Sequence, residues 1–289
     1  MTTTPAQPTG DSAPRPNWFA RHDLALFFVL AFVLSWLAWP AVLSNPDSSP
    51  LVPFGPALAA ITVTALAGGA KQVLYLLRQL GRWRVHPGWY AIAVGLPFAL
   101  TGLAVILAVV AGAPAPDAET YEGWYQLPVS LLITLLIVGC FEELGWRGFA
   151  LPRLQRSRTA LTSALLIGVL WAIWHLPELV SDPTDQRPPL PFFVWVIALS
   201  VILAWLYNST SGSVLIVALS HSAANTAGAF LLPAFDGDLY LLVMWLMAAA
   251  YAAAAVSIVL LAGADQLTTR LTDRRASAGG DGPLQRQQR

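Results

Sequence analysis

Residues 131–148 read LLITLLIVGCFEELGWRG, an apolar run with three ionisable side chains near its end. The run has close to the length that a helix needs to cross a bilayer, about 20 residues. Each charged side chain in such a helix costs about 2.5–3.5 kcal/mol on insertion scales, so these groups normally pair, line a cavity or take part in chemistry. The fold and function therefore depend on what surrounds Glu142, Glu143 and Arg147.

The composition sets the class of protein. Of the 289 residues, 56% are hydrophobic and 11% are charged, which is too apolar for a soluble globular domain. Eight segments have the length of a transmembrane helix, and they cover residues 23–43, 51–69, 88–112, 127–149, 160–180, 190–207, 213–232 and 239–263. The sequence thus predicts an all-α, polytopic membrane protein with about eight transmembrane helices.

Polar tails flank this apolar region. Residues 1–22 and 264–289 are predicted to be disordered, so that residues 23–263 form one transmembrane domain. The only cysteine, Cys140, lies inside a membrane segment, which excludes a disulfide framework. We interpret Cys140 as a small buried hydrophobic residue.

The basic residues are segregated to one side of the predicted bundle. Except for Arg147 and Arg187, every lysine and arginine lies in a tail or in the loops after the second and fourth segments. The opposite loops carry acids instead, namely Asp47, Asp117, Glu119, Glu122, Asp182, Asp185, Asp236 and Asp238. The positive-inside rule then predicts that both tails are cytoplasmic. Residues 71–84 are amphipathic and are expected to form a helix in the cytoplasmic interface, or else an ordinary loop helix.

The three ionisable residues of the opening segment fall on two helix faces. Glu143 and Arg147 are four residues apart and form a pair in the favoured order. Glu142 points about 100° away from Glu143 and has no such partner on its own helix. We interpret the Glu143–Arg147 pair as structural and Glu142 as a candidate general base. The alternative is an ion cluster that braces helices and does no chemistry.

Two later segments carry histidines at helical spacing from a second notable side chain. Trp171 and His175 share one face, and Pro177 follows them. His221 and Asn225 share a face in the same way. Each pair has a structural interpretation as well, as a hydrogen-bonded core histidine in the first case and as interhelical polar contacts in the second.

The order Glu-Glu-x-x-x-Arg, aromatic-x-x-x-His, His-x-x-x-Asn on three membrane helices resembles the CPBP family. That family groups type II CAAX prenyl endopeptidases with bacteriocin-processing and self-immunity proteins of bacteria. The resemblance covers a motif core of about 125–230 and departs at Trp171, where the family more often has Phe. The matching residues are Glu142, Glu143, Arg147, Trp171, His175, His221 and Asn225.

The resemblance implies an intramembrane endopeptidase of the glutamate type. Glu142 would activate a water molecule, His175 would help to hold that water, and His221 and Asn225 would donate hydrogen bonds to the oxyanion. The implied partners are the lipid bilayer and a peptide or protein substrate, with or without a lipid group. No nucleic acid partner is expected, and the expected location is a bacterial cell membrane.

Two alternatives stay open at this point. Glu142, His175 and His221 could hold Zn²⁺ with an open coordination position, although the resemblance to prenyl endopeptidases favours a reaction without metal or other cofactor. The chain could also be a non-catalytic immunity or scaffold protein, or a transporter, since transporters place Glu, Arg and His inside the membrane too. The lack of an inverted repeat in the sequence argues against a transporter.

The predicted boundaries create a difficulty in depth. They place Glu142 and His221 in the cytoplasmic half of the bilayer, whereas His175 lies about 22 Å along its helix at 1.5 Å per residue. Straight helices would therefore keep the three motifs apart. A tilted fifth segment, or a re-entrant segment before it, would bring them together.

Overall fold

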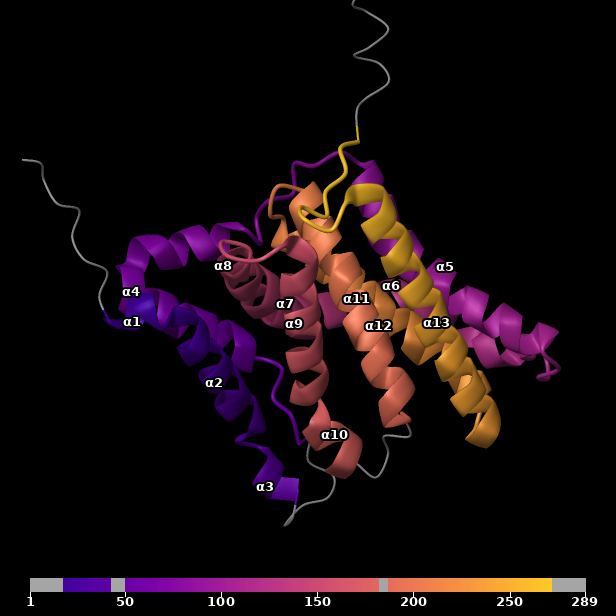
Figure 1. Ribbon diagram of the computed structural model, residues 1–289. Helices are drawn as coiled ribbons and strands as arrows, with labels where there is room; N and C mark the ends of the chain where they lie inside the picture. The colour runs from indigo at the N-terminus through magenta and orange to yellow at the C-terminus, as the bar shows by residue number, and fades with distance from the viewer. Residues whose placement is uncertain (1–17, 43–49, 182–186, 272–289) are drawn as a thin grey trace, which may run out of the picture.

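The computed structural model describes residues 18–42, 50–181 and 187–271, and all regular structure in these ranges is helical (Figure 1). Eight helical segments are long and apolar enough to cross a membrane, and they are Asp23–Ala41, Gly55–Arg78, Gly88–Val110, Ala118–Leu154, Ala160–Ser181, Pro189–Ser209, Val214–Ala234 and Gly237–Ala262. The predicted all-α, polytopic architecture is confirmed.

The helices pack as one bundle in which neighbours along the chain are often not neighbours in space (Figure 1). Helix α2 (Asp23–Trp36) packs against α4 (Gly55–Arg78), and α12 (Val214–Leu231) packs against α5 (Gly88–Val110). Helix α11 (Pro189–Ser209) lies between α9 (Ala160–Trp174) and α13 (Gly237–Ala262). The short helices α1 (Trp18–Arg21), α3 (Trp39–Val42), α10 (Leu176–Ser181) and η4 (Leu232–Ala234) extend the ends of longer ones.

The fourth span is the irregular one. It runs through η1 (Ala118–Gln126), α6 (Leu127–Thr134), η2 (Leu135–Gly139), α7 (Cys140–Glu143), η3 (Leu144–Ala150) and α8 (Leu151–Leu154). Both η2 and η3 are π-helical, a widened form that is rare and is often found at functional sites. The two glutamates of α7 therefore lie between two distorted turns.

Two glycines beside α7 allow the neighbouring helices to approach its backbone. A Cβ atom at Gly139 would lie 2.7 Å from the carbonyl oxygen of Ala218 in α12, and one at Gly145 would lie 2.7 Å from the carbonyl oxygen of Pro56 in α4. Real Cβ atoms do not come so close, so any larger residue would push these helices apart. The fourth span is thus clamped between α4 and α12 at the level of the glutamates.

The segment 71–84, predicted as a separate amphipathic helix, is partly helical. Its first residues continue α4 beyond a bend at Gly69, whose φ of 71° suits glycine, and the helix ends at Arg78. The two parts of α4 run in different directions (Figure 1). Its placement in a membrane interface remains a prediction.

The described structure extends into both of the predicted polar tails. Residues 18–21 form α1, and the chain after 263 packs onto the ends of α9 and α11. Leu267 is fully buried, the Ala160 N–H donates to the carbonyl of Asp265, and Asn208 donates to the carbonyl of Gln266. The predicted disorder of residues 1–17 and 272–289 lies outside the described residues.

Candidate active site

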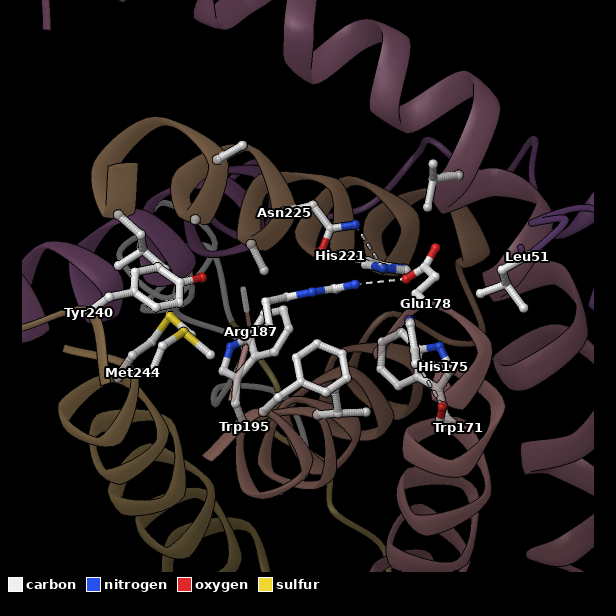
Figure 2. A pocket seen from close by; sticks show the side chains of 18 of the residues that line it. Leu51, Trp171, His175, Glu178, Arg187, Trp195, His221, Asn225, Tyr240 and Met244 are labelled. Carbon is white, nitrogen blue, oxygen red and sulfur yellow. Dashed lines mark hydrogen bonds and ion pairs between the residues drawn. The ribbon is translucent and has the colours of Figure 1, made fainter. Parts of the chain in front are cut away.

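The three polar motifs converge on one cavity of about 890 Å³. Glu142 enters it from α7, Trp171 and His175 from the end of α9, and His221 and Asn225 from α12 (Figure 2). Helix α9 ends at Trp174 and His175 caps it, so the imidazole lies where the helix gives way to α10. The separation expected from straight helices is therefore wrong.

The end of the fourth span explains this correction. Gln79 connects two helices at one level, because its side-chain Nε2 donates to the carbonyl of Gly148 (3.2 Å) and its backbone carbonyl accepts from the N–H of Val214 (3.2 Å). Glu142 precedes Gly148 by about as many residues as separate Val214 from His221, so the two side chains reach the same cavity at a similar level. The span also continues to Leu154, past the predicted end at residue 149, which places Glu142 deeper in the bundle.

Glu143 and Arg147 form the pair that their spacing predicted. Nη1 of Arg147 donates to both carboxylate oxygens of Glu143, at 2.8 and 3.0 Å, and both side chains are fully buried. Oε1 of Glu143 also lies 2.9 Å from Nδ1 of His221, a contact that the sequence did not indicate. This last contact has the distance of an ion pair but not the geometry of a hydrogen bond. Glu143 thus connects its own span to α12.

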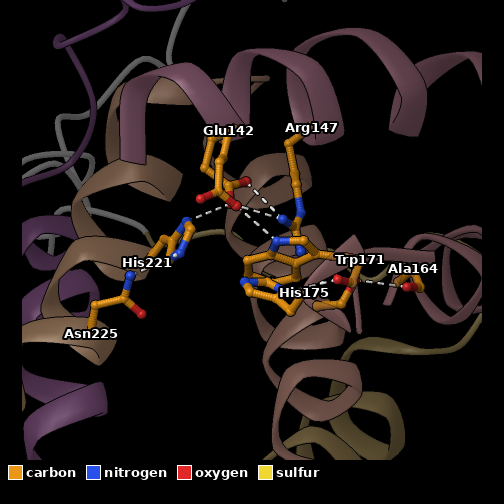
Figure 3. A network of polar contacts seen from close by, with 9 residues as sticks. Glu142, Arg147, Ala164, Trp171, His175, His221 and Asn225 are labelled. Atoms are coloured by element: carbon orange, nitrogen blue, oxygen red, sulfur yellow. Dashed lines mark hydrogen bonds and ion pairs between the residues drawn. The ribbon is translucent and has the colours of Figure 1, made fainter. Parts of the chain in front are cut away.

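Glu142 has a partner on another helix. Nε1 of Trp171 donates to Oε2 of Glu142 at 2.8 Å (Figure 3). The Trp171 ring also carries the guanidinium of Arg147 over its face, 4.6 Å from the centroid, and meets the His221 ring edge-on at 4.9 Å. The Trp171 side chain therefore contacts Glu142, Arg147 and His221. Its ring also lies 5.8 Å from the His175 ring. Within the described chain Oε1 of Glu142 accepts no hydrogen bond.

The histidine tautomers follow from their neighbours. Nδ1 of His175 lies 2.8 Å from the carbonyl oxygen of Trp171, which only accepts, so Nδ1 carries the proton and Nε2 is left as an acceptor. Nδ2 of Asn225 lies 3.3 Å from Nε2 of His221. With the amide as donor, Nε2 of His221 accepts and its proton lies on Nδ1, which faces Glu143. One N–H of Asn225 then remains for another acceptor.

The cavity wall carries a charged pair, Arg187 and Glu178, that was not predicted from the sequence. Nη2 of Arg187 lies 2.8 Å from Oε2 of Glu178, and the guanidinium lies 4.6 Å above the centre of the Phe192 ring (Figure 2). Trp195, Tyr240 and Met244 complete a largely apolar wall. Glu178 could have been predicted from its spacing, because it follows His175 by about one helical turn.

The candidate metal ligands do not form a metal site. In residues 18–42, 50–181 and 187–271, no three His, Cys, Asp or Glu side chains lie close enough to share an ion. The geometry shows why Glu142, His175 and His221 do not fit. Both ring nitrogens of His221 face protein groups, and His175 has only Nε2 left.

Comparison with known proteins bears on the same part of the chain. Residues 124–227 match the family model described as type II CAAX prenyl endopeptidase Rce1-like. The chain is also 29% identical over 105 residues to CAAX prenyl protease 2 of Methanococcus maripaludis, an alignment that covers 34% of this chain and 39% of that protein. The match thus spans well under half of this relative.

The segment that matches the family model contains all three motifs, and it overlaps closely with the predicted motif core of 125–230. Residues 124–227 are therefore similar to the type II CAAX prenyl endopeptidases, the similarity that the motifs predicted.

Proposed function

We propose that this protein is an intramembrane endopeptidase that hydrolyses a peptide bond with a water molecule activated by Glu142. The observation that carries the proposal is the convergence of Glu142, His175 and Asn225 on one cavity. Each comes from a different span, and each has a polar atom that makes no hydrogen bond to a described residue. The name of the matched relative, a prenyl protease, supports peptide hydrolysis as the reaction.

Glu142 and His175 are suited to hold the attacking water. The hydrogen bond from Trp171 fixes Oε2 of Glu142, so that Oε1 is left to take a proton from water. Nε2 of His175 is an acceptor and can hold the other water proton. The hydroxide attacks the peptide carbonyl, and the proton passes from Glu142 to the amine nitrogen as the C–N bond breaks.

Asn225 is suited to stabilise the negative charge that this attack creates. One N–H of its amide is held by Nε2 of His221, and the second is available to the oxyanion. His221 is in turn placed by Glu143, which faces its Nδ1. In this arrangement Asn225 touches the substrate and His221 acts as a positioning residue, which refines the expectation that both side chains donate to the oxyanion.

The cavity walls indicate what the substrate must tolerate. Phe192, Trp195, Met244 and Met247 present aromatic and thioether surface that accepts an apolar side chain or a lipid group equally well. We propose a peptide or protein substrate that reaches the site within or beside the bilayer. We propose a reaction without a metal ion, because both ring nitrogens of His221 face protein groups and only Oε1 of Glu142 and Nε2 of His175 remain as donors.

A comparison of cleaved peptides tests this function. Membranes from cells that express the wild-type chain should yield peptide fragments that are missing from cells expressing the Glu142→Gln variant. Glu119→Gln is a matched control, because it makes the same change at an exposed position on the same span. Identical fragments from the wild type and a folded Glu142→Gln variant would contradict the proposal and favour a non-catalytic membrane protein.

A further inference from the structure

The candidate cavity lies toward one end of the bundle. Beyond the polar motifs, its lining comes from segments at that end, namely Leu51 and Pro53 before α4, Glu178 and Arg187 after α9, and Pro233 and Asp236 after α12. Of these, Pro233 and Asp236 are exposed. The mouth of the cavity is therefore at the end of the molecule that holds α10 and the start of α13 (Figure 1).

The other end of the site is closed by packed protein. Every residue from Leu144 to Leu151 is buried. Behind them, Tyr207 donates to Oε1 of Gln79 at 2.7 Å, and Nε2 of Gln79 donates to the carbonyl of Gly148. Gln79 itself is only 3% exposed, so packed side chains separate Glu142 from this end of the bundle.

The basic residues lie at the closed end. Arg82 and Arg84 follow Gln79 closely, and Arg153, Arg156 and Arg158 follow the buried run. Two contacts fix these segments to the same end: Arg82 donates to the carbonyl of Ser211, just before α12, and Arg153 pairs with Asp23, at the start of α2, at 2.7 Å. By contrast, the described charged residues that line the cavity include only one lysine or arginine, Arg187.

Because lysines and arginines mark the cytoplasmic side of membrane proteins, the closed end is the cytoplasmic one. We propose that the site opens to the opposite, non-cytoplasmic side, and that its substrate is a peptide segment exposed there, such as the outer end of a membrane-anchored or exported peptide. A cytoplasmic protein tail would not reach Glu142 through the closed end. The proposal rests on the proposed peptidase function for its substrate, but the direction of access can be measured without any catalysis.

Single-cysteine labelling measures the direction of access in the full-length protein. A Cys140→Ser background removes the natural thiol, since Cys140 is the only cysteine. Asp236→Cys and Ala229→Cys then report on the mouth and wall of the cavity, and Arg84→Cys and Ser157→Cys report on the basic end. All four positions are exposed. Each variant is treated with a membrane-impermeant maleimide, in intact spheroplasts and after lysis.

We expect the Asp236→Cys and Ala229→Cys variants to be labelled as fully in intact spheroplasts as after lysis. The Arg84→Cys and Ser157→Cys variants should lose their labelling in intact spheroplasts and regain it on lysis. The reverse pattern would overturn the proposal, because it would place the cavity mouth in the cytoplasm. Labelling of Asp236→Cys without labelling of Ala229→Cys would also overturn it, because the cavity would then be closed from that side.

A second readout connects access with the substrate. Maleimide applied from outside should abolish peptide cleavage in the Ala229→Cys variant and leave cleavage by the Arg84→Cys variant unchanged. Adding Glu142→Gln to the labelling variants should leave the labelling pattern intact while cleavage is lost. If the labelling pattern holds but no variant cleaves any peptide, the proposed function fails and the direction of access stands.

Discussion

The polar centre of this protein has two sides that differ in what they leave unused. On the cavity side, Glu142, His175 and Asn225 each keep a polar atom that makes no hydrogen bond to a described residue. On the closed side, Glu143 and Arg147 are fully buried and bound to each other through two hydrogen bonds. Adjacent glutamates on one short helix thus have different partners. Glu143 is paired with an arginine of its own span, whereas Glu142 accepts a hydrogen bond from another span, and we propose that this difference separates a structural carboxylate from a reactive one.

The largest expected effect is the loss of activity on the cavity side. Glu142→Gln keeps the shape of the side chain and can still accept the hydrogen bond from Trp171, but it removes the group that takes a proton from water. We expect peptide cleavage to be abolished while the thermal unfolding temperature in detergent stays close to that of the wild type. Near-normal cleavage by this variant would show that Glu142 is not the base.

The same substitution on the closed side should affect stability first. Glu143→Gln leaves the Arg147 guanidinium buried without its counter-charge, and Arg147→Met does the same to Glu143. Removing one partner of a buried pair costs about 3–5 kcal/mol. Unfolding by denaturing detergent should show a loss of this size for each variant.

A double variant sharpens that test. Because each single change strands the other partner, Glu143→Gln combined with Arg147→Met should cost clearly less than the sum of the two single changes. Simple additivity would mean that the two side chains act independently and would contradict the pairing.

The local part of this arrangement could be predicted from the sequence, and the part between helices could not. Glu143 with Arg147, and His221 with Asn225, lie four residues apart, and helical geometry alone brings each pair together. The eight spans follow from apolar length in the same direct way. Such features depend on one helix at a time.

The contacts of Glu142 with Trp171 and of Glu143 with His221 depend on how helices pack. The angle of about 100° between neighbouring side chains assumes a regular helix. The π-helical turns of residues 135–139 and 144–150 break that assumption on both sides of α7. The depth of the site could not be predicted without the true end of the fourth span, which is Leu154. After residue 149 the helix continues, and the next charged residue in the sequence is Arg153.

The third prediction concerns the oxyanion donor on the cavity side. Removing a donor that acts on charge formed only in the transition state lowers kcat by about 10²–10³. We expect Asn225→Ala to cause such a fall with little change in KM, because substrate binding does not use this bond. Asn225→Asp should be at least as harmful, because its charge would repel the oxyanion. A purified-enzyme assay that finds an effect on KM alone would return Asn225 to a structural role.

The fourth prediction tests the hydrogen bond that joins the two sides. Trp171→Phe keeps a ring beside Arg147 and His221 but removes the N–H that orients Glu142. We expect kcat to fall by about tenfold, which corresponds to about 1.4 kcal/mol. Trp146→Phe is a matched control, because Trp146 is equally buried and its Nε1 has no partner within the described chain. If both variants lose activity equally, the effect comes from packing and not from the bond to Glu142.

Metal removal is expected to have the smallest effect on activity, because the residues of the closed side occupy one of the candidate ligands. A catalytic zinc ion normally takes three protein ligands and keeps one open position. His221, the ligand candidate nearest the closed side, has Glu143 against Nδ1 and Asn225 against Nε2. His175 and Glu142 have one donor atom each left over, Nε2 and Oε1, and two donors are too few for a catalytic zinc site.

Activity in detergent should therefore survive dialysis against a strong chelator, and the purified protein should contain zinc at well below one ion per chain. A complete loss of cleavage on chelation, reversed by Zn²⁺ and not by Mg²⁺, would contradict this prediction. It would require Nε2 of His221 to leave Asn225 in the active enzyme, while Glu143 at Nδ1 would support the metal-bound imidazole, and the closed side would then be part of the reactive centre.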